Sequence, residues 1–355
     1  MSGTSDARVP QQRALGLEIL RFVLALAVLM YHYGYYGPRF DYLDGTPVWF
    51  EPLVFGRFAV PVFFIISGFV IAMTAQNRTL GAFALARFAR LFPALALCST
   101  LTFLGFLNFS DAPMGLIAIY WAKSISFIGV AWGGNLIDPS YWSLVYEWRF
   151  YIAIGLLIAM GQLKSALPFM TLVALAGALL EIAGFELFKL DILLFPFLPF
   201  FAIGMVFYQA RETGWTTWLG LVFGLHCLLA IFGVFTEIAA SKDVLFLSTG
   251  LILTAVAIPC LAILIFQGAI RLKVPNRLGH LATVLGAASY PLYLLHQNLG
   301  YFAINIGTER GLDQASATLL ATLAMILLAV AIALWFEPRA TAAIKSSFRR
   351  SKPSG

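Results

Sequence analysis

The chain has 355 residues, of which 61% are hydrophobic and 11% are charged, and its mean hydropathy is +0.87. Soluble domains carry about 25% charged residues, so this composition excludes a soluble globular protein and indicates a polytopic membrane protein. The net charge of +6 is explained by basic loops on one side of the membrane and gives no reason to expect nucleic-acid binding.

Ten apolar runs are long enough to cross about 30 Å of hydrocarbon. They cover residues 15–36, 55–75, 91–109, 142–160, 166–183, 191–209, 217–236, 245–267, 283–305 and 315–336. The first run exceeds a signal-peptide core and is followed by no small-residue cleavage site, so we expect it to be retained. The semi-apolar stretch at 114–130 is interrupted by Lys123, and we predict an interfacial or re-entrant segment there. The fold class predicted is all-α, a bundle of about ten transmembrane helices.

The distribution of lysine and arginine predicts the orientation of this bundle. With the N-terminus inside, cytoplasmic segments hold 15 of the 23 basic residues and outer loops hold five. Both termini are therefore expected in the cytoplasm. We predict three parts: an N-terminal tail at 1–14, a transmembrane domain at 15–338 and a basic C-terminal tail at 339–355, with both tails disordered because they are polar.

Arg21 and His32 lie eleven residues apart in the first apolar run. On a helix they share one face, about 16 Å apart along the axis. Ionisable residues inside a membrane usually face the bundle interior and mark a functional path. The alternative is an arginine that extends to the cytoplasmic interface and a histidine at the opposite interface. Glu18 precedes Arg21 by three residues, so we expect an ion pair that orients the guanidinium.

Arg87 and Arg90 precede Pro93 at the cytoplasmic start of the third run. Their spacing of three places both on one helix face, where two guanidinium groups can bind a phosphate through charge-assisted hydrogen bonds. The alternative is the ordinary excess of cytoplasmic basic residues.

Ser143, Glu147 and Tyr151 recur every four residues and form a polar ridge at the outer start of the fourth run. A carboxylate there must be paired or protonated. Glu147 could orient a histidine or an arginine across the bundle, or it could pair with Arg149 or a lipid headgroup.

Ser67, in the segment FFIISGF at 63–69, is either a polar site residue or a small residue for helix packing. His296 follows a proline kink and either lines a polar cavity or bonds a neighbouring helix. Glu337 and Pro338 are expected to cap or anchor the last helix, and His226 to form an interhelical hydrogen bond. The three cysteines have no metal-ligand spacing, and we predict no metal site.

Taken in chain order, these segments resemble the acyltransferase-3 family of integral-membrane O-acyltransferases. The matching motifs are Glu18 to Arg21 with ten residues before His32, residues 63–69, Arg87 and Arg90 with Pro93, WSLVYE at 142–147, SYPLYLLH at 289–296, and Glu337 with Pro338. The resemblance extends from about residue 13 to 340. Glu18 departs from the pattern, because aspartate is the commoner residue at this position of the family.

The resemblance implies transfer of an acetyl or other short acyl group from cytoplasmic acyl-CoA, as co-substrate, to a hydroxyl of a glycan or lipid-linked sugar. It implies that His32 is catalytic and that Arg87 and Arg90 bind the donor, which leads us to predict Arg21 as a further donor contact and Glu147 as a second catalytic group. Ser67, Ser143, Tyr151 and His296 are expected to support the cavity. The membrane implied is the bacterial inner membrane.

Two other classes fit the residues alone: a secondary transporter of a small polar solute, and a flippase or assembly component of a glycan pathway. Neither would consume acyl-CoA in a reaction that depends on His32.

Overall fold

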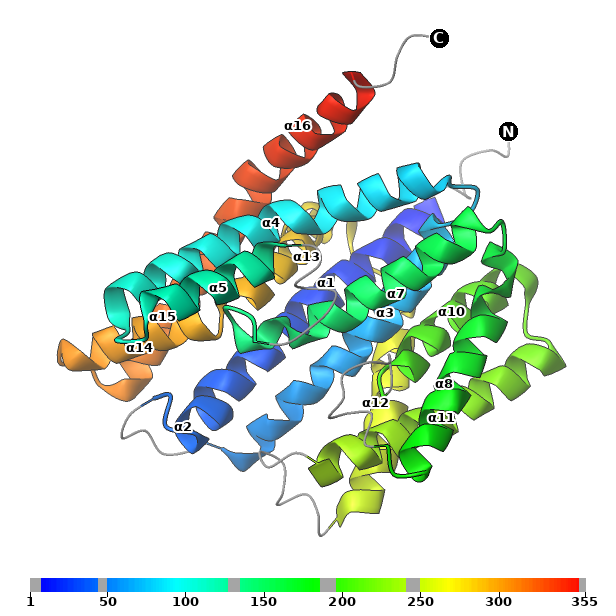
Figure 1. Cartoon of the computed structure of the whole chain (residues 1–355), viewed down its shortest axis with the longest axis horizontal. Helices are drawn as coiled ribbons and strands as arrows, with labels where there is room; N and C mark the ends of the chain where they lie inside the picture. Colours follow the sequence, from blue (N-terminus) through cyan, green and yellow to red (C-terminus); the bar gives the residue numbers. More distant parts are fainter. Residues whose placement is uncertain (1–7, 44–49, 127–134, 186–195, 241–249, 351–355) are drawn as a thin grey trace. The chain divides into compact units, whose positions relative to one another are not determined.

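The computed structural model describes residues 8–43, 50–126, 135–185, 196–240 and 250–350 (Figure 1). All regular elements in these ranges are helices, which confirms the all-α class. Nine of the described helices are long and apolar enough to cross a membrane. Part of the sixth predicted run, 191–209, falls outside the described ranges, and its remainder lies in helix α10. The chain is therefore a polytopic helical membrane protein.

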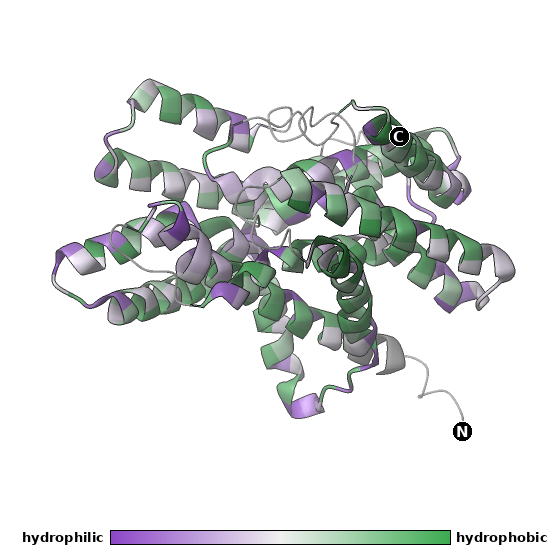
Figure 2. Cartoon of the chain, turned by 90° about the horizontal axis from the view of Figure 1, so that it is seen from below, coloured by the Kyte–Doolittle hydropathy of each residue, from purple (hydrophilic) through white to green (hydrophobic). Residues whose placement is uncertain are grey.

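The long helices, in chain order, are α1 (Arg8–Tyr31), α3 (Ala59–Thr74), α4 (Leu80–Phe109), α5 (Met114–Ile125), α7 (Trp142–Ala159), α8 (Ala166–Ile182), α10 (Leu198–Thr213), α11 (Thr217–Ala240), α12 (Leu251–Arg271), α13 (Gly279–Leu295), α14 (Asn298–Glu309), α15 (Gln314–Ala331) and α16 (Glu337–Arg350). The short segments are η1 (His32–Tyr36), α2 (Gly37–Arg39), η2 (Glu51–Phe58), η3 (Pro139–Tyr141), η4 (Leu163–Ser165), η6 (Asn276–Leu278) and η7 (Ile332–Phe336). In Figure 2 hydrophobic residues cover most of the helices, and hydrophilic residues gather at their ends and connections.

The helices form two compact units. The first contains Met1–Arg57, Ala84–Val145 and Ala269–Gly355. Within it α1 packs against α13, and α15 packs against α13 and α14. A Cβ atom at Gly16 of α1 would overlap the carbonyl oxygen of Ala269, so glycine permits a close backbone approach there.

The second unit contains Phe58–Phe83 and Tyr146–Gly268. Its centre is the pair α3 and α10, and α8 and α11 pack against α10. Gly68 of α3 lies against the backbone of Phe201, and Gly204 of α10 lies against that of Ile65. Reciprocal glycines therefore bring these two helices together at backbone distance.

Four sequence predictions need correction or refinement. The apolar run at 283–305 is two helices, α13 and α14, separated at His296 and Gln297.

The C-terminal tail was predicted to be disordered, but α16 is helical to Arg350. Alanine, lysine and arginine favour helix, and α16 continues directly from the preceding helix, so polarity alone was a poor guide. Likewise α1 begins at Arg8, inside the predicted N-terminal tail. Helix α5 accounts for the first part of the predicted 114–130 segment, and residues 127–134 lie outside the described ranges.

Two segments, η1 and η7, are π-helical. The N–H of Gly37 bonds the carbonyl of His32, and the N–H of Glu337 bonds that of Ile332. Each π-turn ends two residues before a proline, Pro38 or Pro338. Proline has no N–H and collides with the carbonyl four residues back. The wider turn relieves that collision without ending the helix, and such turns are frequent at functional sites.

Candidate active site

Two buried histidines contact each other in the first unit. His32 begins η1, and His296 directly follows α13. Nε2 of His296 lies 2.9 Å from Nδ1 of His32. Nδ1 of His32 also lies 2.9 Å from the carbonyl oxygen of Val28, and Nδ1 of His296 lies 2.7 Å from that of Tyr293. The structure thus brings together two candidate residues that lie 264 positions apart in the chain and that the sequence analysis had considered separately.

Tyrosine hydroxyls hold the backbone around this pair. Tyr33 donates to the carbonyl of His296 at 2.6 Å, and Tyr301 donates to the carbonyl of His32 at 3.4 Å. Tyr293 lies 2.8 Å from the carbonyl of Ser140 and 2.7 Å from the Ser143 hydroxyl. Ser143 is therefore part of the same network. We call this network, together with Asp138 and Asn298 described next, the imidazole cluster. Its members are His32, Tyr33, Asp138, Ser140, Ser143, Tyr293, His296, Asn298 and Tyr301.

Asp138 is a member of the cluster that sequence analysis missed. It is fully buried, and its Oδ1 accepts from the N–H and hydroxyl of Ser140 at 2.9 and 2.6 Å. Its Oδ2 accepts from the N–H of Asn298 at 3.0 Å. Burial raises the pKa of this carboxyl from 3.8 to about 6, although the hydrogen bonds oppose the shift. Aspartate before Pro139 is a typical N-cap signature, but local sequence contains no sign of its burial against α14.

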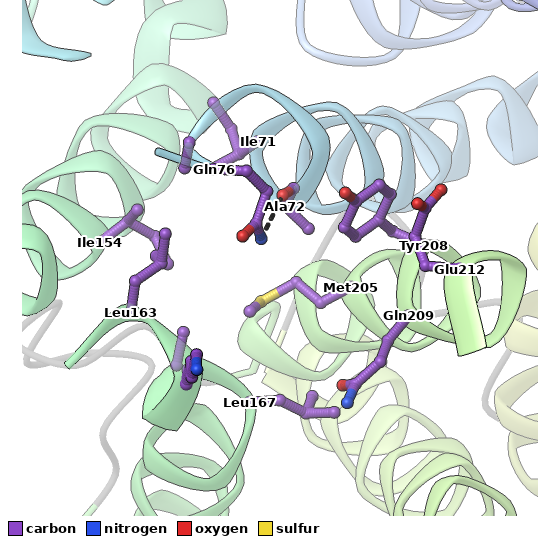
Figure 3. A pocket seen from close by; sticks show the side chains of 13 residues that line it. Ile71, Ala72, Gln76, Ile154, Leu163, Leu167, Met205, Tyr208, Gln209 and Glu212 are labelled. Atoms are coloured by element: carbon purple, nitrogen blue, oxygen red, sulfur yellow. Dashed lines mark hydrogen bonds between the residues drawn. The ribbon is translucent and has the colours of Figure 1, made fainter. Parts of the chain in front are cut away.

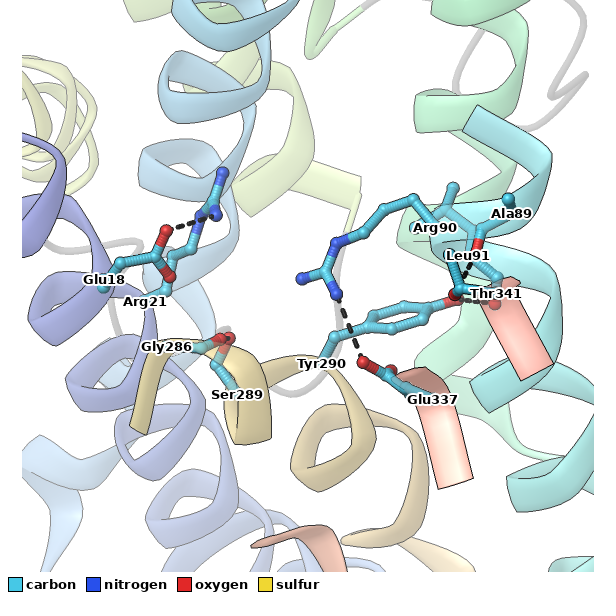
Figure 4. A network of polar contacts seen from close by, with 10 residues as sticks. All are labelled: Glu18, Arg21, Ala89, Arg90, Leu91, Gly286, Ser289, Tyr290, Glu337 and Thr341. Atoms are coloured by element: carbon cyan, nitrogen blue, oxygen red, sulfur yellow. Dashed lines mark hydrogen bonds and ion pairs between the residues drawn. The ribbon is translucent and has the colours of Figure 1, made fainter. Parts of the chain in front are cut away.

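Arg21 pairs with Glu18 at 3.4 Å, which confirms the predicted ion pair. Both side chains are partly exposed, at 22% and 28%. Gly286 of α13 leaves room for the carboxylate, because a Cβ atom there would overlap Glu18 Oε2. Figure 4 shows this pair on one side of α13.

Arg90 forms the second ion pair of this region, with Glu337 at 3.3 Å. Its guanidinium carbon also lies 6.0 Å from the centre of the Tyr290 ring, and Figure 4 shows these two side chains beside Glu337. Glu337 thereby anchors the start of α16 to α4; an anchoring role was predicted, but this partner was not. Thr341 adds a hydrogen bond to the carbonyl of Ala89 at 2.8 Å. We call Glu18, Arg21, Arg87, Arg90 and Glu337 the arginine region.

Glu147 lies in the second unit with Ser67 and Tyr151. Its Oε1 accepts a hydrogen bond from the Ser67 hydroxyl at 2.9 Å and another from the Tyr151 hydroxyl. Arg149 instead lies over the Tyr146 ring, 5.9 Å from its centre. Ser67 is thus a polar partner, whereas the neighbouring Gly68 makes the close helix contact. A role for Glu147 in orienting an imidazole stays a prediction.

The second unit also contains a cavity of about 410 Å³ (Figure 3). Polar side chains in its lining include Gln76, Lys164, Tyr208 and Glu212, and apolar ones include Met205. None of the predicted site residues lines it, so cavity volume does not locate the predicted chemistry. No cluster of three or more potential metal ligands occurs in the described parts of the chain.

Comparison with known proteins gives one family match. A family described as "Acyltransferase domain" matches residues 15–337. No curated protein and no solved structure matches the chain. The matched range includes every member of the imidazole cluster and of the arginine region.

Proposed function

This chain belongs to the acyltransferase-3 family of membrane acyltransferases, and we propose that it transfers an acetyl or other short acyl group from cytoplasmic acyl-CoA to a glycan hydroxyl. Exopolysaccharide, O-antigen or another sugar-bearing molecule is the proposed acceptor, and the bacterial inner membrane the proposed location. The observation that carries the proposal is a buried, hydrogen-bonded imidazole in the same compact unit as the arginine region.

His32 is the proposed general base. A sugar hydroxyl is a weak nucleophile near neutral pH, and a positioned base contributes typically 10²–10⁴-fold. His32 takes the hydroxyl proton as the oxygen attacks the thioester carbonyl carbon. The carbon–sulfur bond then breaks, and the imidazolium returns the proton to the departing thiolate. His32 is therefore neutral again at the end of the reaction, and no proton is exchanged with solvent.

The arginine region is the proposed donor site. The phosphates of coenzyme A cannot enter hydrocarbon cheaply, so they stay at the cytoplasmic face while the pantetheine arm reaches inward. Arg90 is 38% exposed, whereas its partner Glu337 is 10% exposed. The guanidinium is therefore open to an anion from the water side, and a phosphate can bind it through multidentate, charge-assisted bonds. Arg87, one turn earlier on α4, adds a second guanidinium.

Glu147 is the proposed second catalytic group. Hydrogen bonds from Ser67 and Tyr151 fix the direction of its carboxylate. A group that orients a base or accepts charge must have such a fixed direction. Glu147→Gln keeps the shape of the side chain and removes the charge, so it is the variant that isolates this role.

The proposal is tested by thiol release from acetyl-CoA in proteoliposomes supplied with membrane glycans. We expect His32→Ala to fold and to lose at least about 100-fold in rate, whereas His280→Ala, at an exposed histidine, keeps wild-type rate. Wild-type rate in His32→Ala contradicts the base assignment. Solute flux without thiol release contradicts acyl transfer altogether. Mass spectrometry of surface glycans from a deletion strain, searched for a missing acyl increment, identifies the acceptor.

A further inference from the structure

We infer that His296 is a positioning residue that holds His32 in the tautomer with its hydrogen on Nδ1, so that Nε2 is the nitrogen that accepts the substrate proton. The inference concerns the direction and protonation of the imidazole, and it rests on the proposed role of His32 as the base.

The tautomer of His296 follows from its backbone contact. Nδ1 of His296 lies 2.7 Å from the carbonyl oxygen of Tyr293, and a carbonyl oxygen only accepts hydrogen bonds. Nδ1 must therefore carry a hydrogen. Because neutral imidazole has one N–H, Nε2 of His296 carries a lone pair.

The tautomer of His32 follows in turn. Its Nδ1 lies 2.9 Å from two acceptors, the bare Nε2 of His296 and the carbonyl oxygen of Val28. A hydrogen on Nδ1 bonds both acceptors, whereas a lone pair there would face two others. Both rings are buried, with exposures of 8% and 0%, and an unmatched polar contact is costly in such surroundings. Nε2 of His32 is thus left bare.

The surrounding contacts keep the two rings in this arrangement. Tyr33 holds the carbonyl of His296, and Tyr301 holds the carbonyl of His32. During the reaction the hydroxyl proton moves to Nε2 of His32, and the positive charge strengthens the bonds from Nδ1–H to its two acceptors. The proton then leaves to the thiolate, and His296 stays neutral throughout. The aspartate of a serine protease triad orients its histidine by the same logic.

The tautomer is measured directly by ¹⁵N NMR of histidine-labelled protein in detergent, with His32→Ala to assign the signal. Protonated and bare imidazole nitrogens differ widely in chemical shift. We expect Nδ1 of His32 to be protonated and Nε2 to be bare. The reverse assignment overturns the inference, whatever the protein's activity.

Kinetics of His296 variants separate positioning from packing. His296→Ala removes one of the two acceptors of Nδ1–H and the ring that packs against His32, leaving the Val28 carbonyl alone to hold the imidazole. We therefore expect kcat to fall at least about 10-fold, while KM for acetyl-CoA changes less than twofold. His296→Gln places an amide oxygen near the same point, so it should recover most of kcat. His226→Ala is the matched control, because His226 is equally buried and bonds Thr171 at 3.0 Å in the second unit.

The outcomes are distinguishable from failure of the proposed function. Wild-type kcat in His296→Ala, or an equal loss in the Ala and Gln variants, overturns the inference while an inactive His32→Ala still upholds the base. Full activity in His32→Ala overturns the base itself. Should His296→Ala fail to fold, the Gln variant and the NMR assignment decide.

Discussion

The imidazole cluster and the arginine region lie in the same unit but are built differently. In the cluster, two imidazole rings, tyrosine hydroxyls and Asp138 are buried and bonded mainly to backbone groups or to one another. In the arginine region, the pairs of Arg21 with Glu18 and of Arg90 with Glu337 involve long side chains, and the two arginine side chains are 22% and 38% exposed. A buried, satisfied network fixes geometry, whereas a guanidinium that water reaches can exchange its partner for a dissolved anion. The first suits proton transfer, and the second suits capture of an anionic ligand.

The largest expected effect is the pH dependence caused by Asp138. Its pKa is about 6 in the folded protein and 3.8 ordinarily, so the folded state binds the proton more tightly. The free energy of unfolding therefore falls as pH rises from about 4 to about 6, by roughly 3 kcal/mol, and this group adds no change above that window.

Thermal unfolding in detergent between pH 4 and 7 measures this slope. Asp138→Asn lacks the titrating group and should show a smaller slope, at lower stability because an amide nitrogen would face the N–H of Asn298. Equal slopes in the two proteins would contradict the assignment.

Removing the guanidiniums of Arg87 and Arg90 together tests the arginine region. We expect Arg87→Ala with Arg90→Ala to raise KM for acetyl-CoA about 100-fold, because charge-assisted hydrogen bonds contribute roughly 1.5–3 kcal/mol each and part of that gain is offset by release of Glu337. kcat should change less than about threefold. Arg277→Ala, at an exposed arginine outside the arginine region, is the control for general loss of basic charge. An unchanged donor KM would remove the phosphate site.

Gly300→Ala breaks the cluster without changing a polar group. A Cβ atom there would overlap the Tyr33 hydroxyl oxygen and lie 2.6 Å from the ring carbon Cζ. Tyr33 is fully buried, so the rigid ring has no open space to enter. We expect a loss of about 2 kcal/mol in unfolding free energy and a fall in kcat. A stable, fully active variant would show that the cluster is less rigid than its contacts imply.

Gly286→Ala is the matching change in the arginine region. Its Cβ atom would overlap the Glu18 carboxylate and lie 2.5 Å from Glu18 Cβ. The carboxylate belongs to a side chain that is 28% exposed and can rotate toward water, but Cβ is fixed to the backbone, so α1 and α13 must also separate slightly. We expect a cost of about 1 kcal/mol and an effect on donor KM rather than on kcat. A loss equal to that of Gly300→Ala would erase the contrast between the two regions.

Sequence reasoning located the spans and most polar candidates because apolar length and charge are local properties. Glu18 and Arg21 are three residues apart, so their pairing was predictable. The contacts of His32 with His296 and of Arg90 with Glu337 join residues 264 and 247 apart, and one sequence contains no signal for such pairings. Asp138 was missed because a carboxylate before a proline indicates a cap, not burial.

The break after α13 was missed for another reason. Gln297 and Asn298 are short interruptions within an apolar run, and averaging hydropathy over about twenty residues conceals them. That break places the imidazole of His296 at a helix end rather than in mid-span. In the second unit the sequence showed the polar ridge of α7. It did not show that Ser67 on α3 would be the partner of Glu147, because this is again a pairing between residues distant in the chain.

The π-turn at His32 has a consequence for how length changes act on this protein. A π-turn amounts to one additional residue within an α-helix, and each residue of an α-helix advances the rotation by about 100°. Deleting one residue among 33–36 would remove that additional residue and restore regular winding, so the segments on either side would keep nearly their present rotation. A deletion in the regular part of α1 would instead rotate one end of the helix against the other by about 100°. The π-turn is therefore the place where this helix can lose one residue while the side chains on either side keep their directions.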